Sequence, residues 1–276
     1  GFIKNYYYSL YFIFPIIGVW LVYLIKKNFI KKEIGHGIST TLYAISKRSG
    51  IIERYKMFAS LIVAPITVGF GGSVGLQGPA VSTGAALGSN VASMFHMNAK
   101  TRMLLIGCAT AGAMSSMFKA PVAAIVFAVE IFSLDLVFTS LVPLLLASVA
   151  AVITSYFFRG TDVLFSFELL DAWRVKDIIF YVFLGVATGI ASVYFSKMYF
   201  LITRFFGWFS NAYVKIGIAA LAIGLMLYLF PPLYGEGYGL INNLLNGNTE
   251  AALSGIQYQI DFNNIWMVIV ILLIIA

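Results

Sequence analysis

Residues 71–79 read Gly-Gly-Ser-Val-Gly-Leu-Gln-Gly-Pro and interrupt an apolar chain where a membrane-spanning helix would be expected. An apolar segment, 64–70, precedes them, and a stretch rich in small residues, 80–95, follows. Pro79 suits the first turn of the second helix, because its missing N–H would have no partner there. Non-helical backbone is tolerated in a membrane only where it is buried in protein or lines a wet cavity. The sequence therefore predicts a helix amino terminus directed into the bilayer, with free N–H donors for an anion.

The composition is that of a polytopic membrane protein. Of the 276 residues, 61% are hydrophobic and 11% are charged, whereas soluble domains carry about a quarter charged residues. The net charge of +7 comes from lysines and arginines in short loops between apolar segments, as membrane topology requires, so it does not indicate nucleic-acid binding. The single cysteine, Cys108, lies in an apolar run and is expected to be a packed thiol, because one cysteine forms no disulfide or metal framework.

Several apolar segments are short or broken by Gly and Pro, which predicts an all-α fold with broken and re-entrant helices. Residues 6–25 are long enough to span, and basic clusters at 26–32 and 47–56 are expected in the cytoplasm. A short segment that does not cross is expected at 35–45. Further helices are expected at 55–68, 80–95, 102–117, 121–132, 137–158, 178–206, 213–230 and 235–245, with the start of another at 265–276.

Two interruptions correspond to one another along the chain. Residues 35–37 read Gly-His-Gly and residues 235–237 read Gly-Glu-Gly, and each follows an apolar span and opens a short helix. Interrupted segments in corresponding positions of two halves are typical of transporter binding sites. The pattern therefore indicates an internal repeat.

Three motifs resemble signatures of the CLC family of chloride channels and chloride/proton exchangers. Residues 35–39, Gly-His-Gly-Ile-Ser, resemble the family's Gly-Ser-Gly-Ile-Pro, and residues 75–79, Gly-Leu-Gln-Gly-Pro, resemble its Gly-Lys/Arg-Glu-Gly-Pro. Residues 118–130 run from Phe-Lys-Ala-Pro to Phe-Ala-Val-Glu and are similar to the family's Phe-Asn-Ala-Pro…Phe-x-x-Glu. Order and spacing agree, and the likeness covers nearly the whole chain.

The resemblance implies a CLC-like inverted-repeat fold in the cell membrane. The first repeat, N-terminally incomplete, would occupy residues 1–158, and the start of the second, C-terminally incomplete, residues 159–276. We expect the chain to be part of a longer protein, because a Gly-x-Phe-x-Pro motif and a late tyrosine of the family would follow residue 276. The partners implied are chloride or another small anion, the lipid bilayer and a second copy in a homodimer with one pore per subunit.

The resemblance assigns anion binding to the two glycine-containing turns. Taking a bare ion into a low-dielectric interior costs tens of kcal/mol, and a permeant site must offset that cost without holding the ion too tightly. Helix amino termini suit this role, because each presents roughly half a positive charge and several N–H donors. The residues so assigned are Gly35, His36, Gly37, Ile38, Leu76, Gln77 and Gly78.

Two departures from the family concern proton coupling. Gln77 stands where the family has its gating glutamate, and a neutral amide neither takes up nor releases a proton near physiological pH. Ile131 stands where the exchangers carry a second, proton-relaying glutamate. Both positions favour passive chloride conduction without proton coupling. The alternative function is an antiporter with a neutralised gate, and the alternative role of Gln77 is that of a lining residue without a gating role. One sequence does not tell whether Gln77 is natural or engineered.

Other positions leave more than one interpretation open. His36 replaces a serine that contacts the ion in the family, so it is either an anion contact or a hydrogen-bonded helix cap. Glu130 matches a carboxylate expected to be structural, bonded to backbone N–H groups or to a cation. Lys119 either attracts anions to a pore mouth or snorkels from a helix end.

Competing functions come from different classes. The transported ion can be another anion such as fluoride or nitrate. A second alternative is a membrane-embedded regulatory or scaffolding protein that conducts nothing. An enzyme is not expected, because no nucleotide-binding, metal or nucleophile motif occurs in the sequence. No cofactor is expected, and chloride is the expected bound substrate.

Overall fold

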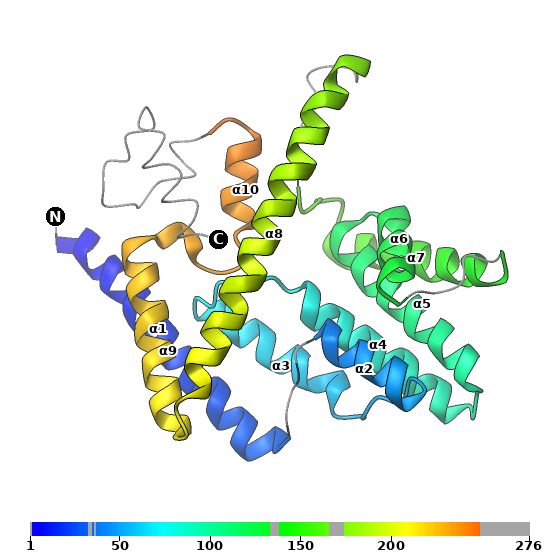
Figure 1. Ribbon diagram of the computed structural model, residues 1–276, viewed down its shortest axis with the longest axis horizontal. Helices are drawn as coiled ribbons and strands as arrows, with labels where there is room; N and C mark the ends of the chain where they lie inside the picture. The colour runs from blue at the N-terminus through cyan, green and yellow to red at the C-terminus, as the bar shows by residue number, and fades with distance from the viewer. Residues whose placement is uncertain (1, 33–34, 36, 133–137, 166–173, 249–276) are drawn as a thin grey trace. The chain divides into compact units, whose positions relative to one another are not determined.

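The computed structural model describes residues 2–32, 35, 37–132, 138–165 and 174–248, and every structural statement below is confined to these (Figure 1). They form helices and no strand. The bounds are α1 Phe2–Ile25, continued by a π-helical turn Lys26–Ile30; α2 Ile38–Arg48; α3 Lys56–Gly69; α4 Gln77–Met94; α5 Ala99–Phe118; α6 Pro121–Phe132; α7 Phe138–Arg159; α8 Ile178–Gly207; α9 Ala212–Leu229; and α10 Tyr238–Leu245.

The predicted helices agree with the structure except at some ends. Helical backbone stops at Gly69 and resumes at Gln77, so the predicted interruption is present. The start predicted for the second helix, residue 80, is wrong by one turn, because Gln77 and Gly78 already have helical backbone and Pro79 is the third helical residue. The predicted span at 265–276 lies outside the described residues.

The chain folds into two compact units, and the unit made of Ile17–Ser166 and Tyr234–Tyr238 holds the predicted site residues. Its centre is the packing of α5 against α4, α6 and α7. Glycines allow this packing: a Cβ on Gly84 would lie 2.8 Å from the carbonyl oxygen of Ala109, and one on Gly88 would collide with the carbonyl of Leu105. Small residues at helix contacts of this kind let backbones approach closely in membrane proteins.

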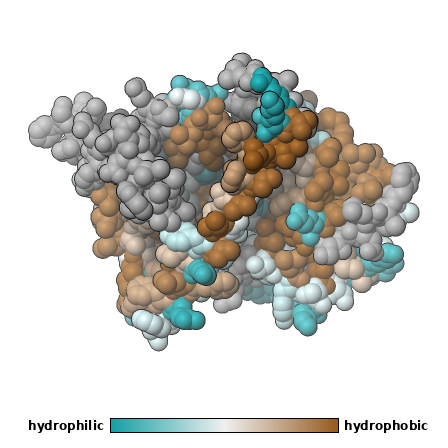
Figure 2. Space-filling model, turned by 45° about the horizontal axis from the view of Figure 1, so that its top comes forward, coloured by the Kyte–Doolittle hydropathy of each residue, from teal (hydrophilic) through white to brown (hydrophobic). Residues whose placement is uncertain are grey.

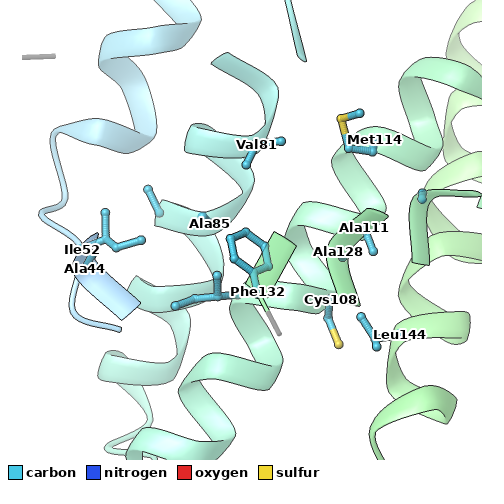
Figure 3. Close-up of a cluster of buried hydrophobic side chains, with 13 residues drawn as sticks. Ala44, Ile52, Val81, Ala85, Cys108, Ala111, Met114, Ala128, Phe132 and Leu144 are labelled. Atoms are coloured by element: carbon cyan, nitrogen blue, oxygen red, sulfur yellow. The ribbon is translucent and has the colours of Figure 1, made fainter. Parts of the chain in front are cut away.

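A cluster of buried apolar side chains fills the space between these helices (Figure 3). Cys108 is one of its members, which confirms the expected packed thiol. Its largest fully buried side chains include Ile106 and Leu144. The other members are Ala44, Ile52, Val81, Ala85, Ala86, Ala111, Met114, Ala124, Ala128 and Phe132.

The connection between α2 and α3 is fastened to α4 by polar side chains. The hydroxyl of Ser89 accepts the N–H of Ile52 at 2.9 Å and donates to the carbonyl of Gly50 at 2.6 Å. The amide of Asn90 donates to the carbonyl of Ile52 at 3.1 Å. Because α2 lies beside α4 and is anchored at its carboxyl end, its amino terminus is held at a defined place on α4.

The second unit comprises Gly1–Ile16, Phe167–Leu233 and Gly239–Ala276. Within it, α9 packs closely on α1, because a Cβ on Gly224 would lie 2.8 Å from the carbonyl oxygen of Phe12. None of the residues of α8 is buried, and most of its side chains are apolar. Apolar surface left open on every side of a helix is expected where lipid or further protein covers it.

Among the described residues, four helices are long and apolar enough to cross a membrane. Much of the described surface seen in Figure 2 is apolar, with polar side chains in scattered groups. Both observations agree with the composition of the sequence. The four candidate spans are Tyr11–Ile30, Thr139–Arg159, Val175–Gly207 and Ala212–Leu229.

Candidate anion-binding site

The amino-terminal ends of α2 and α4 meet at two glycines. Gly37 is the residue before α2 and has φ 55° and ψ −112°. A Cβ built on Gly37 would lie 3.2 Å from the carbonyl oxygen of Gly78 and 3.3 Å from its Cα, in the first turn of α4. A side chain at position 37 is therefore disfavoured by both backbone conformation and space. The structure thus brings together the two turns that the sequence analysis assigned to anion binding.

The start of α4 leaves backbone donors without intrahelical partners. The N–H of Ala80 is the first to bond within the helix, donating to the carbonyl of Leu76 at 3.0 Å. The N–H groups of Gln77 and Gly78 precede it and have no intrahelical acceptor, while Pro79 has no N–H. The first turn contains no acidic residue and no side-chain cap. The positive end of this helix is therefore not neutralised by its own residues.

The start of α2 has the same character. The N–H and the hydroxyl of Thr41 both donate to the carbonyl of Gly37, each at 3.3 Å. The N–H groups of Ile38 and Ser39 come before this bond and have no intrahelical acceptor. No acidic residue lies in the first turn, and the residue before α2 is a glycine without a side-chain cap. Two uncapped helix starts in contact concentrate donors and positive dipole in one place, an arrangement that favours an anion.

The side chain of Gln77 is held at its amide nitrogen and lies close to Gly75 with its carbonyl oxygen. Its amide nitrogen Nε2 donates to the hydroxyl oxygen of Tyr238 at 3.2 Å. Its carbonyl oxygen Oε1 lies over Gly75, so closely that a Cβ at position 75 would collide with it. Gly75 is therefore required for this orientation of the gate-position side chain.

The remaining predicted site residues are Gly35, His36, Ile38 and Leu76. Gly35 is exposed, and Ile38 and Leu76 are partly buried next to the two helix starts. His36 lies outside the described residues, so the choice between anion contact and helix cap stays open. The sequence pattern does not single out Tyr238. Its one signal is its place at the opening of a short helix after the second Gly-x-Gly.

The acidic and basic candidates lie elsewhere in this unit. Glu130 is exposed near the end of α6. Ile131 is partly buried against the apolar cluster. The ammonium of Lys119 donates to the carbonyl of Gly160 and lies 4.8 Å from the ring centre of Tyr156. Lys119 therefore fastens the α5–α6 junction to the end of α7.

A cavity of about 940 Å³ lies beside the start of α4, between α3, α4, α5 and α7. Most of its wall is apolar, and Leu76 and Pro79 form the part next to the helix start. Arg159 and Glu236 are the charged residues among those that line it. The hydroxyl oxygen of Thr83, also in the wall, is buried without a hydrogen-bond partner among the described residues. The site thus adjoins a space large enough for water or packed side chains.

Tyr238 opens α10, outside the four candidate spans. Burial, and secondly the negative charge of Glu236, raise the pKa of the Tyr238 phenol above its usual value. The phenol therefore stays protonated and neutral at physiological pH. A neutral phenol oxygen can accept the Gln77 amide and still carry a proton to donate.

Comparison with known proteins matches most of the chain to one family. The family model described as voltage gated chloride channel matches residues 17–276. The solved structure of a CLC-type fluoride/proton antiporter matches 99% of this chain and 67% of its own, with a TM-score of 0.72 and 23% identity. A slow cyanobacterial Cl⁻/H⁺ antiporter matches 85% of this chain and 56% of its own, with a TM-score of 0.68 and 18% identity. These likenesses confirm the predicted all-α fold with broken helices.

Similar sequences come from bacteria and a plant. A putative chloride channel protein, ClcB-like, from Ralstonia nicotianae is 26% identical over 76% of this chain and 50% of its own length. The H⁺/Cl⁻ exchange transporter ClcA of Vibrio cholerae is 28% identical over 67% of this chain and 42% of its own. Chloride channel protein CLC-f of Arabidopsis thaliana is 27% identical over 71% of this chain and 26% of its own. The chain thus spans half or less of the length of these relatives.

Proposed function

The chain belongs to the voltage-gated chloride channel (CLC) family, an integral membrane family of channels and transporters, and we propose that the protein it comes from passes chloride or another small anion across the bilayer. The observation that carries this proposal is the contact between two uncapped helix starts at Gly37 and Gly78. The protein acts as a transporter of ions without a cofactor, and not as an enzyme. It works in the lipid bilayer as a homodimer with one pathway per subunit.

The physical basis is the replacement of water by backbone N–H groups. An anion at the two helix starts exchanges hydration for the backbone donors of Ile38, Ser39, Gln77 and Gly78. Partial charges bind it without the strong hold of a lysine or arginine, so the ion can leave again. The absence of acidic side chains from both first turns leaves this attraction undiminished.

The transport is passive in this proposal, because neither proton-handling position can titrate. Gln77 is an amide held by Tyr238, and Ile131 packs against the apolar cluster. The names of several relatives and of both solved structures describe proton-coupled exchange or antiport, so an antiporter is the second candidate. It requires a proton path that uses neither position.

The test is paired flux with the full-length protein reconstituted in liposomes. A chloride gradient is imposed, and external chloride and external pH are recorded together. We expect chloride efflux that needs a potassium ionophore to dissipate the membrane potential, with no uphill proton movement. Uphill proton movement driven by chloride would establish the antiporter instead. A folded dimer that passes neither chloride, nitrate nor fluoride would favour the non-conducting scaffold.

A further inference from the structure

The segment Tyr234–Tyr238 lies across the interruption between α3 and α4. At one end the hydroxyl of Tyr234 donates to the carbonyl of Gly69, the last residue of α3, at 2.6 Å. At the other end the hydroxyl oxygen of Tyr238 accepts from Gln77, the first residue of α4. Two tyrosines four residues apart therefore tie both sides of the helix break to one segment, about 160 residues later in the sequence.

The ring of Tyr238 is fixed by other aromatic side chains. It meets Phe165 edge to face, with ring centres 5.4 Å apart and planes at 81°. Phe165 in turn stacks on Phe118, the last residue of α5, with ring centres 6.3 Å apart and planes at 16°. Aromatic pairs in such geometries stabilise one another beyond their buried area. The hydroxyl is thus presented to Gln77 by a ring with little freedom to turn.

We propose that Tyr238 is a positioning residue that holds the gate-position side chain of Gln77 in one orientation, against Gly75, and so keeps it from entering the anion path at Gly37 and Gly78. This inference rests on the proposed function for its consequence, but the contact itself stands on the geometry. The phenol acts through Gln77. Without its hydroxyl, the amide has no partner at that end and samples other orientations, some of which obstruct the path.

The first experiment is a double-substitution cycle on chloride flux. Tyr238→Phe keeps the ring edge to face with Phe165 and removes the hydroxyl. We expect flux to fall about fivefold, the effect of losing one hydrogen bond of ordinary strength. In the Gln77→Ala background the same substitution should change flux by less than about 1.5-fold, because no side-chain amide remains to be held. An equal loss in both backgrounds would overturn the proposal, since it would reflect packing alone.

The second readout is a pH profile in the Gln77→Glu background. There the phenol donates to the introduced carboxylate and favours its charged form, so the flux midpoint should lie lower with Tyr238 than with Tyr238→Phe, by about one pH unit. Among the described residues, the charge that acts on Tyr238 is that of Glu236 on the same segment. Arg159 lines the same cavity as Glu236, and the ammonium of Lys119 is bonded to Gly160. None of these is altered by the substitution, and a midpoint that does not move would overturn the proposal.

The matched control is Tyr234→Phe, which removes the other hydroxyl of the same segment and leaves the contact with Gln77 in place. We expect it to leave the pH midpoint of the Gln77→Glu background unchanged. A shift as large as that of Tyr238→Phe would assign the effect to anchoring of the segment, and the proposal would fail.

Thermal unfolding in detergent separates this proposal from the proposed function. If the unsubstituted protein conducts no anion, the proposed function fails, while the contact can still be measured. The losses in melting temperature from Gln77→Ala and Tyr238→Phe should then be less than additive when combined. Additive losses would show that the two side chains do not hold one another.

Discussion

Substitution of Gly37 by alanine tests the contact on which the candidate site depends. Gly37 has φ 55° and ψ −112°, a conformation that side-chain-bearing residues rarely adopt and that costs about 1–3 kcal/mol when imposed on them. The new methyl group would also lie 3.2–3.3 Å from the carbonyl group and Cα of Gly78, so the backbone must shift by a few tenths of an ångström. Both effects push the starts of α2 and α4 apart.

The size of the effect follows from the strain. A cost of about 1–3 kcal/mol lowers the population of the original geometry roughly 5- to 150-fold. If an anion passes only where both helix starts face it, chloride flux per folded protein should fall by a factor in that range. The assay is chloride efflux from liposomes at matched protein density, with isothermal titration of chloride onto the same detergent-purified sample. Weaker binding and slower flux are expected to go together.

The matched control is Gly69→Ala at the end of α3. A Cβ on Gly69 would meet nothing within 4 Å, and the φ of Gly69 is not in the region that favours glycine. It should keep flux within about twofold of the unsubstituted protein, in line with the small effects of unstrained surface changes. Flux and chloride affinity left intact by Gly37→Ala, in a protein that melts at the original temperature, would refute the idea that the two helix starts form the anion site.

Two further substitutions test the gate position and the helix packing. Gln77→Glu should slow chloride flux and make it fall as pH rises, because the carboxylate is charged above its pKa and then competes with the anion. Flux is measured between about pH 4.5 and 8, a range that brackets the usual carboxyl pKa and its common upward shifts. An unchanged rate that does not vary with pH would remove the gate assignment. Gly88→Ala should destabilise the protein by more than about 2 kcal/mol, since its methyl group collides with the carbonyl of Leu105. The control is Gly185→Ala, whose Cβ meets nothing within 4 Å and which should stabilise α8 slightly. Equal melting temperatures for Gly88→Ala and Gly185→Ala would contradict the close packing of α4 on α5.

The helices and their interruption could be predicted from the sequence because local physics determines them. Gly and Pro at 71–79 break the apolar pattern, and the small residues of α5 indicate close packing, which Gly84 and Gly88 then provide from α4. The sequence predicts the start of α4 one turn late, because Gly78 and the glycines before it disfavour helix and mask the helix preference of Gln77. Only the position of Pro79 within the first turn is clear. Helix ends depend on such single contacts more than helix interiors do.

The partner of Gln77 could not be predicted from the sequence. Tyr238 is 161 residues away, and no periodicity relates the two positions. A tyrosine in a short polar turn is equally consistent with an interfacial anchor. Only the three-dimensional packing of Phe118, Phe165 and Tyr238 shows that the ring is fixed next to the start of α4. Roles of this kind arise from tertiary contacts, which local sequence patterns do not encode.

The segment at the second interruption supplies a hydrogen-bond partner for the first interruption, between α3 and α4. Backbone that leaves a helix inside a membrane exposes carbonyl and N–H groups, each of which needs a partner. The carbonyl of Gly69 receives the hydroxyl of Tyr234 from the second interruption, whereas the N–H groups at the start of α4 receive no side-chain cap from any described residue. The break is thus satisfied on its carbonyl side and left open on its donor side. That asymmetry is what a site for a mobile anion requires, because a permanent protein acceptor at the donors would occupy the place of the ion.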